Sequence, residues 1–226
     1  MSLADTLRQA LSHGLHRIGQ IEIRTIDPAV PAYRLCHADD LALADQPAFG
    51  GLAVHRGGDA ARELATFSPD GEYRFAKAQT NLARGWVLLL EGLDELHRAL
   101  DLFYPAALGV WAAQQDGRLE IQHLRDKLNR QTGMYRFARN ISDAGAQRLV
   151  REVCGPAHQC AKRILWQLDA DTPLEDSEAS RYTGIPGDLP ANEAIPLLCR
   201  EACNHFVAEC RQASKAEAEA KKAAGD

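Results

Sequence analysis

The sequence lacks the signals that identify membrane-spanning and exported proteins. No run approaches the roughly 18 uninterrupted apolar residues of a membrane span. The start, Met1 to Asp5, carries no basic segment of the kind that opens a signal peptide. We therefore expect a cytoplasmic protein that does not associate with a membrane. Thiols stay reduced in that compartment, so clustered cysteines are expected to bind metal rather than to form disulfides.

Common catalytic signatures are absent as well. The chain has no Gly-rich phosphate loop, no His-Glu-x-x-His helix and no nucleophile elbow, so no catalytic residue can be assigned. It also lacks an excess of positive charge, because 26 basic residues face 31 acidic ones and the net charge is -5. This balance argues against a polyanion-binding protein and makes nucleic acid an unexpected partner. The sequence carries no signal for an oligomeric state.

The hydrophobic pattern changes character near residue 90. Before it, the alternation at Ile21 and Ile23, the alternation from Tyr33 to Cys36 and the apolar run Trp86 to Leu90 predict strands. After it, apolar residues recur at helical spacing, at Leu93, Leu96, Leu100 and Phe103. We predict an α+β fold, with a small antiparallel sheet and helices over residues 1–90. A mainly helical half follows over residues 91–226 and ends in a flexible charged tail.

Four of the six cysteines form two spaced pairs, Cys154-x5-Cys160 and Cys199-x3-Cys203, on either side of a 38-residue span without cysteine. Two close pairs that are brought together by folding can surround one metal centre with four thiolates. We predict that the helical half clamps such a centre. Cys36 and Cys210 are expected to be buried bystanders.

The local sequence around each pair predicts where the thiols lie. Cys154 follows a helical pattern that Gly155 and Pro156 end, and Cys160 is expected to open a second helical stretch. A third helix is expected to start near Pro196 and to carry Cys199 and Cys203 on one face. Helix ends expose N–H groups that stabilise thiolates. The alternative is that the second pair belongs to a plain apolar helix stripe, since cysteine is often buried.

The spacing bears on which metal is bound. Structural zinc sites favour Cys-x2-Cys to Cys-x4-Cys knuckles, which an x5 spacing fits poorly. The order x5, long gap, x3 resembles the cluster ligation of sirohaem-dependent sulfite and nitrite reductases, in which four cysteines hold a [4Fe-4S] centre. That resemblance covers the cysteines only, so neither sulfite reduction nor a bound sirohaem is inferred.

A broader resemblance covers about residues 60 to 210. It is carried by the four cysteines and by the segments Gly71-Glu-Tyr-Arg74, Leu82-Ala-Arg-Gly-Trp86, Ala99-Leu-Asp-Leu-Phe-Tyr-Pro105 and Arg130-Gln-Thr-Gly-Met-Tyr-Arg136. Together they resemble the stabilising and iron-sulfur domains that follow a CbiX-type chelatase domain. The resemblance implies a [4Fe-4S] cluster on Cys154, Cys160, Cys199 and Cys203, and a link to tetrapyrrole metal insertion. No chelatase domain fits within the first 60 residues, so chelatase activity is not carried over.

Further residues are candidates for contacts with the cluster or with a ligand. Donors near cluster sulfur and local burial set a cluster's potential, and the candidates for this role are Gly155, His158, Arg163 and Trp166. Six basic residues face two acids between Arg118 and Arg139. They are either a solvated helix face or a surface for an anion such as a tetrapyrrole propionate. In the second case, Arg130, Tyr135 and Arg136 would form the anionic-ligand site.

The sequence thus predicts a [4Fe-4S] protein in electron transfer or redox sensing, linked to tetrapyrrole metabolism. Its expected partner is a redox protein or a tetrapyrrole-related ligand. One alternative is a zinc-stapled interaction or nucleic-acid-binding module that uses the same cysteines and the basic stretch 118–139. Another is an enzyme subunit in which the cysteines are only core.

Overall fold

The computed structural model describes residues 2–27, 31–66, 81–154, 160–172, 174 and 193–224. Their contacts divide the chain into two compact units. Unit 1 is the described part of Met1–Leu119 and Gly184–Leu197, and unit 2 is the described part of Glu120–Thr183 and Leu198–Asp226. The segment Gly71-Glu-Tyr-Arg74 and about half of the 38-residue span between the cysteine pairs lie outside the described residues.

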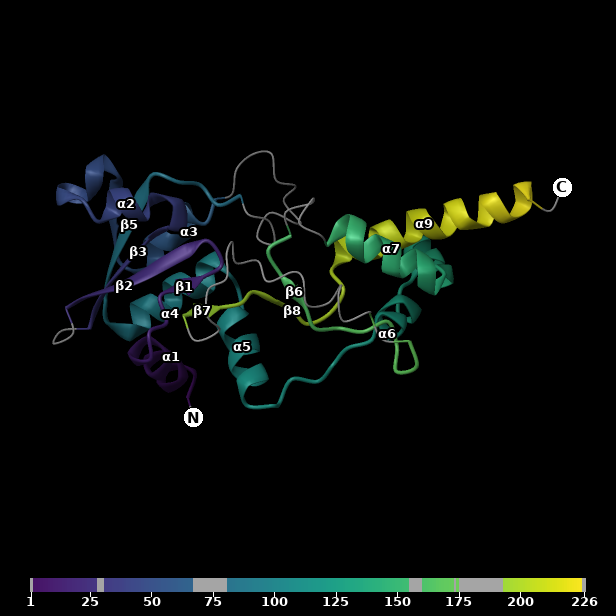
Figure 1. The fold of residues 1–226 in the computed structure, drawn as a ribbon, viewed down its shortest axis with the longest axis horizontal. Helices are drawn as coiled ribbons and strands as arrows, with labels where there is room; N and C mark the ends of the chain where they lie inside the picture. The colour runs from purple at the N-terminus through teal and green to yellow at the C-terminus, as the bar shows by residue number, and fades with distance from the viewer. Residues whose placement is uncertain are drawn as a thin grey trace. The chain divides into compact units, whose positions relative to one another are not determined.

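Unit 1 is built on a six-stranded mixed sheet in the order β4-β5-β3-β2-β1-β7 (Figure 1). Its strands are β1 (Arg17–Ile18), β2 (Ile21–Asp27), β3 (Ala32–His37), β4 (Ala53–Arg56), β5 (Trp86–Glu91) and β7 (Ala194–Ile195). The central strands pair antiparallel, whereas β4 with β5 and β7 with β1 pair parallel at the two edges. The α+β fold and the strands expected from alternation are confirmed. The sheet is mixed rather than purely antiparallel, because each edge strand, β4 and β7, pairs parallel with its neighbour.

The helices of unit 1 complete its core. They are α1 (Leu3–Ser12), the single turns α2 (Leu41–Ala44) and α3 (Ala61–Leu64), α4 (Gly92–Phe103) and α5 (Ala107–Gln115). Phe103 of α4 stacks on Trp86 of β5 with ring centroids 5.2 Å apart, and Gln20 N donates to the Tyr104 hydroxyl at 3.0 Å. Because these contacts tie α4 to the sheet, the structure places the boundary between the units after Leu119 and not at residue 90.

Gly19 of unit 1 lies at a position where a side chain would be strained. Gly19 has φ +52°, in the left-handed region, and a Cβ atom built on it would lie 2.7 Å from Cζ of Tyr104. The close approach of this tyrosine ring to the β1–β2 turn therefore depends on the absence of a side chain.

Unit 2 is mainly helical. It contains α6 (Leu124–Asn129), the 3-10 helix η5 (Gly133–Asn140), α7 (Asp143–Val153), α9 (Asn204–Ala223) and the strands β6 (Arg163–Ile164) and β8 (Leu198–Cys199). The residues expected to form a flexible charged tail continue α9 as helix to Ala223. No described helix is long and apolar enough to cross a membrane.

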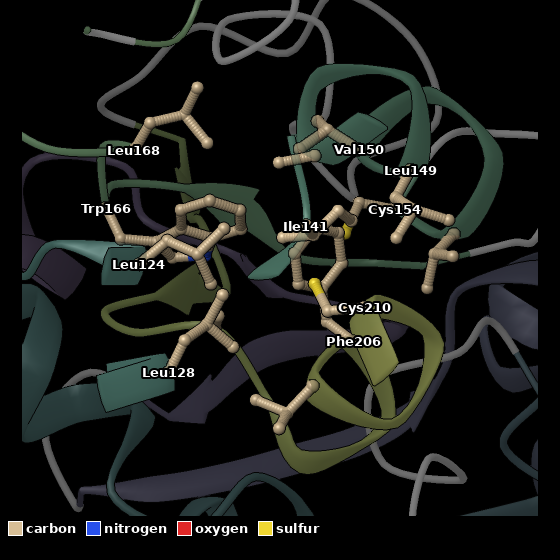
Figure 2. Packing of buried hydrophobic residues seen from close by; sticks show 14 of the residues in the cluster. Leu124, Leu128, Ile141, Leu149, Val150, Cys154, Trp166, Leu168, Phe206 and Cys210 are labelled. Atoms are coloured by element: carbon tan, nitrogen blue, oxygen red, sulfur yellow. The ribbon is translucent and has the colours of Figure 1, made fainter. Parts of the chain in front are cut away.

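The core of unit 2 draws apolar side chains from every one of its elements (Figure 2). The apolar face of α7 contributes Leu149, Val150 and Val153, and the first turn of α9 contributes Phe206, which is fully buried. Glu217, farther along α9, accepts hydrogen bonds from the backbone N–H and hydroxyl of Ser142, the N-cap of α7, at 2.9 and 2.8 Å. This carboxylate satisfies groups at the N-terminus of α7 that the helix itself leaves unpaired.

Candidate metal centre

A short parallel strand pair brings the two cysteine segments together. Strand β6 pairs with β8 so that Ile164 lies opposite Cys199, and Leu165 N donates to Cys199 O at 3.0 Å. Cys160 precedes β6 by three residues, and Cys203 follows β8 by four. The pairing therefore places one member of each cysteine pair next to the same small sheet.

Cys154 lies where the sequence predicts it, at the end of a helix. It is the C-cap of α7, and its N–H donates to Val150 O. Burial, followed by the neighbouring charges of Cys160, Cys199 and Cys203, raises the pKa of its thiol. A helix C-terminus presents carbonyl oxygens, not N–H groups. The expectation that the end of this helix would stabilise a thiolate is therefore wrong for the cap itself.

The second helical stretch, which was expected to open at Cys160, is absent among the described residues 160–172. Cys160 is partly buried and leads into β6 instead. Burial raises the pKa of its thiol, while a hydrogen bond from the backbone N–H of Lys162 lowers it. The local sequence was compatible with a helix, but the pairing with β8, more than 30 residues away in the chain, holds this segment extended.

The prediction that Cys199 and Cys203 share one face of a helix is also wrong. Cys199 ends β8, and α9 begins only at Asn204 with Cys203 as its N-cap. The sulfur of Cys203 accepts a hydrogen bond from Phe206 N at 3.4 Å. A helix N-terminus is the end that stabilises negative charge. A thiolate-stabilising helix end thus exists at Cys203, where the sequence predicted the interior of a helix.

The Cys199 thiol is engaged by its own loop. It donates to Glu201 O at 3.1 Å, and the Glu201 carboxylate pairs with Lys127 Nζ at 3.0 Å. Burial, and then the charge of Cys203, raises the pKa of the Cys199 thiol to about 12. Ligation by Cys199 therefore requires the loss of this proton and of its hydrogen bond to Glu201.

The predicted thiols occupy one neighbourhood without forming a finished ligand set. The thiols of Cys160, Cys199, Cys203 and Cys210 all act on the pKa of Cys154, after burial. Within the part of the chain that the structure describes, no group of three His, Cys, Asp or Glu side chains is positioned to hold a metal ion. The described thiols therefore share a neighbourhood but are not within metal-binding reach of one another.

Cys210 is buried, as the sequence predicted. It is fully buried in α9 and points into the same core as Cys154 (Figure 2). Burial raises the pKa of its thiol to about 12. Its spacing from Cys203, seven residues, puts it two turns along α9, which the sequence could indicate only as part of an apolar stripe. Cys36 lies in β3 of unit 1, buried between β2 and β5.

The residues predicted to surround the metal lie in different environments. Gly155 and His158 lie outside the described residues, and Arg163 is exposed on β6. Trp166 is buried, with its ring 5.2 Å from that of Phe206. Its Nε1 atom makes no hydrogen bond of normal geometry to any described residue. The indole of Trp166 is nonetheless among the groups that lower the pKa of the Cys199 thiol against burial, so its N–H lies near that sulfur.

The basic stretch 118–139 divides into two parts. Arg118, Arg125 and Lys127 pair with Asp116, Asp143 and Glu201 respectively. Arg130, Arg136 and Arg139 are exposed and make no ion pair with any described residue. Arg136 lies over the ring of Phe137, and Tyr135 packs toward the core beneath Arg211. The structure thus separates three paired basic residues from an unpaired arginine surface, which we define as Arg130, Arg136 and Arg139.

Comparisons with known proteins divide the chain close to the end of the first segment of unit 1, at residue 115, and assign residues 184–197 to the second family. Residues 4–115 match the family model of the DR2241 stabilising domain, and residues 116–212 match that of a 4Fe-4S iron-sulfur cluster binding domain. No curated protein matches the chain. Among solved structures, the chain is similar to DR2241 from Deinococcus radiodurans, with 22% identity and a TM-score of 0.69. That protein is described as multi-domain, similar in structure to chelatases, with two additional novel domains. The match covers 94% of this chain and 41% of the relative.

Proposed function

Because the chain joins a DR2241-type stabilising domain to a [4Fe-4S] iron-sulfur cluster binding domain, we propose that unit 2 holds its cluster through Cys154, Cys160, Cys199 and Cys203. The resemblance expected for residues 60 to 210 is confirmed and extends over residues 4–212. The family also favours the cluster over the zinc alternative. The observation that carries the ligand set is the β6–β8 pairing, which brings one cysteine of each pair to the same sheet.

The donor set suits this cofactor. Iron-sulfur clusters take four thiolates, and four thiols lie close enough here for three of them to act on the pKa of Cys154. Backbone N–H groups of Phe206 and Lys162 donate to the sulfurs of Cys203 and Cys160, which stabilises the thiolate forms. When bound, the cluster supplies one-electron redox chemistry.

Serine substitution of each cysteine tests the ligand set. Anaerobically purified wild-type protein should be brown, with broad absorption near 400 nm and about four irons and four sulfides per chain. C154S, C160S, C199S and C203S should each lose most of the iron, whereas C36S, in the core of unit 1, should retain it. A colourless protein with one zinc, or full iron in any of the four variants, would contradict the proposal.

C210S decides between two assignments of the fourth ligand, since Cys210 lies in the same core as Cys154. Retained iron in C210S together with lost iron in C203S supports Cys203 as the ligand. Retained iron in C203S together with lost iron in C210S assigns the role to Cys210 and overturns the proposed set.

We further propose that the cluster exchanges electrons and is not only a staple for the fold. Cys160, Cys199 and Cys203 are only partly buried, whereas Cys154 is buried, so the neighbourhood of the proposed cluster is not fully closed to solvent. Exposure of this kind permits electron exchange with a partner and influences the potential. The proposal requires a reversible one-electron wave in a redox titration followed by electron paramagnetic resonance. Destruction of the cluster on one reduction and reoxidation would show a structural role instead.

A tetrapyrrole-related ligand is favoured by the unpaired arginine surface. Arg130, Arg136 and Arg139 lack ion pairs among the described residues, and guanidinium groups bind carboxylates through paired hydrogen bonds. Uroporphyrin, a tetrapyrrole with eight carboxylates, is a direct probe. The variant R130Q/R136Q/R139Q should weaken its binding about tenfold or more.

The matched control is R118Q, whose arginine already pairs with Asp116 and whose loss should leave uroporphyrin affinity unchanged. If R118Q weakened uroporphyrin binding equally, the effect of the triple variant would be explained by net charge and not by this surface. Uroporphyrin binding that is unaffected by the triple variant would remove the ligand from this surface and favour an acidic redox protein as the partner.

A further inference from the structure

Trp166 carries a buried polar group that the fold of unit 2 leaves without a partner. The residue is 2% exposed, and its Nε1 makes no hydrogen bond to any described residue. A buried donor without an acceptor costs about 1–3 kcal/mol, so orphaned N–H groups are rare in native proteins and call for an explanation.

The β6–β8 pairing brings Trp166 close to Cys199, the cysteine whose thiol its indole acts on. Ile164 lies opposite Cys199 in the β6–β8 pair, and Leu165 N donates to Cys199 O at 3.0 Å. Trp166 is the next residue, so its position relative to Cys199 is set by two backbone pairings. Its ring packs on Phe206 at 5.2 Å, and Phe206 N already donates to the sulfur of Cys203.

Phe206 therefore places a backbone N–H on Cys203, and Trp166 lies near Cys199, the other member of the second cysteine pair. The Phe206 bond is made in the structure, whereas the Cys199 sulfur still carries a proton that is donated to Glu201 O. A thiolate on Cys199 would release that bond and offer an acceptor to the indole.

On the basis of the proposed ligand set, we infer that Trp166 Nε1–H donates a hydrogen bond to the Cys199 thiolate of the loaded cluster and raises its reduction potential. A donor to a ligand sulfur stabilises the reduced cluster more than the oxidised one, because the reduced cluster carries one more negative charge. Trp166 is thus a positioning and tuning residue, and it is not a ligand.

The first test is the substitution W166F, which removes the N–H and keeps an aromatic ring against Phe206. At a fixed ambient potential, the ratio of reduced to oxidised cluster should fall about threefold to tenfold. A tenfold change in this ratio corresponds to about 59 mV for one electron. The control is W86F in unit 1, where the indole N–H donates to Ala83 O at 2.7 Å and its removal should leave the potential unchanged.

The second test is spectroscopic and uses labelling with 15N-indole tryptophan. Among the three tryptophans, only Trp166 belongs to unit 2, and a coupling that is present in the labelled wild type and absent from labelled W166F belongs to this residue. Electron-nuclear double resonance of the reduced protein should show coupling to this nitrogen and to a proton that exchanges in deuterium oxide.

The outcomes separate this inference from the proposed function. A brown, fully loaded W166F protein with the wild-type potential, or a wild-type protein without the exchangeable coupling, would overturn the role of Trp166 alone. A chain that binds no iron and sulfide would overturn both the ligand set and this inference.

Discussion

Phe206 packs in the core of unit 2 beside the proposed cluster ligands, so F206A should lower the free energy of unfolding of unit 2 and accelerate iron loss. The ring is fully buried and lies 5.2 Å from Trp166. Truncation of a buried phenylalanine to alanine costs about 3–5 kcal/mol, of which about 0.5–1.5 kcal/mol belongs to the aromatic pair. The backbone N–H that donates to Cys203 is unchanged, so the loss is one of packing.

Unit 1 contains a matched pair. Phe103 stacks on Trp86 at the same centroid distance, 5.2 Å, and is also fully buried. F103A should cost unit 1 a similar free energy of unfolding. The two variants then differ in which unit they weaken, and only F206A should accelerate iron loss.

The assay is guanidinium denaturation of the cluster-free and cluster-loaded proteins, with iron release followed in parallel. With slopes of about 2–6 kcal/mol/M for small domains in this denaturant, a loss of 3–5 kcal/mol moves the unit 2 midpoint by about 1 M. A shift that corresponds to less than about 1 kcal/mol would refute the packing argument. Equal iron release from F103A and F206A would refute the assignment of the cluster to the core of unit 2.

Three further predictions follow from contacts and burial. E217Q should destabilise unit 2 by about 1 kcal/mol, seen as a lower melting temperature, because Glu217 accepts two hydrogen bonds from Ser142 at the start of α7. G19A should lower the free energy of unfolding by about 2–4 kcal/mol in urea denaturation, since it adds strain at positive φ and a clash with the Tyr104 ring. The control G109A, which has open space around it, should leave the free energy of unfolding unchanged or raise it. Burial raises the pKa of Cys199 to about 12. The contribution of this protonated thiol to the free energy of unfolding of the cluster-free protein should therefore be fully present below the unfolded thiol pKa of about 8.5 and should be lost as the pH rises toward 12. The loaded protein should instead release iron in acid, because protons compete for thiolates.

Much of unit 1 could be predicted because its signals are local. The alternation at Ile21 and Ile23 and the apolar run from Trp86 gave strands where the structure has β2 and β5. Strand β7 could not be found this way, because it is two residues long and is held only by pairing with β1, more than 170 residues away. A pattern with so few residues has no periodicity to detect.

The four thiols could be singled out from the sequence, whereas their local geometry could not. The x5 and x3 spacings identified four thiols that the structure gathers in unit 2. The same spacing was also compatible with a helix through Cys199 and Cys203, and the pairing of β8 with β6 overrides that local preference. Cys203 as an N-cap and the unpaired N–H of Trp166 emerge only from the folded chain.

The position of β7 limits how this protein can be divided. Its two residues complete the sheet of unit 1, yet they are encoded after most of unit 2 and end three residues before Leu198 opens β8. A fragment ending at the boundary between the matched families, near residue 115, would leave β1 as an open sheet edge, which invites pairing with other chains. Unit 2 begun there would carry β7 without its sheet. The two units are therefore interleaved along the sequence, so a single recombination point within the chain cannot separate one complete unit from the other.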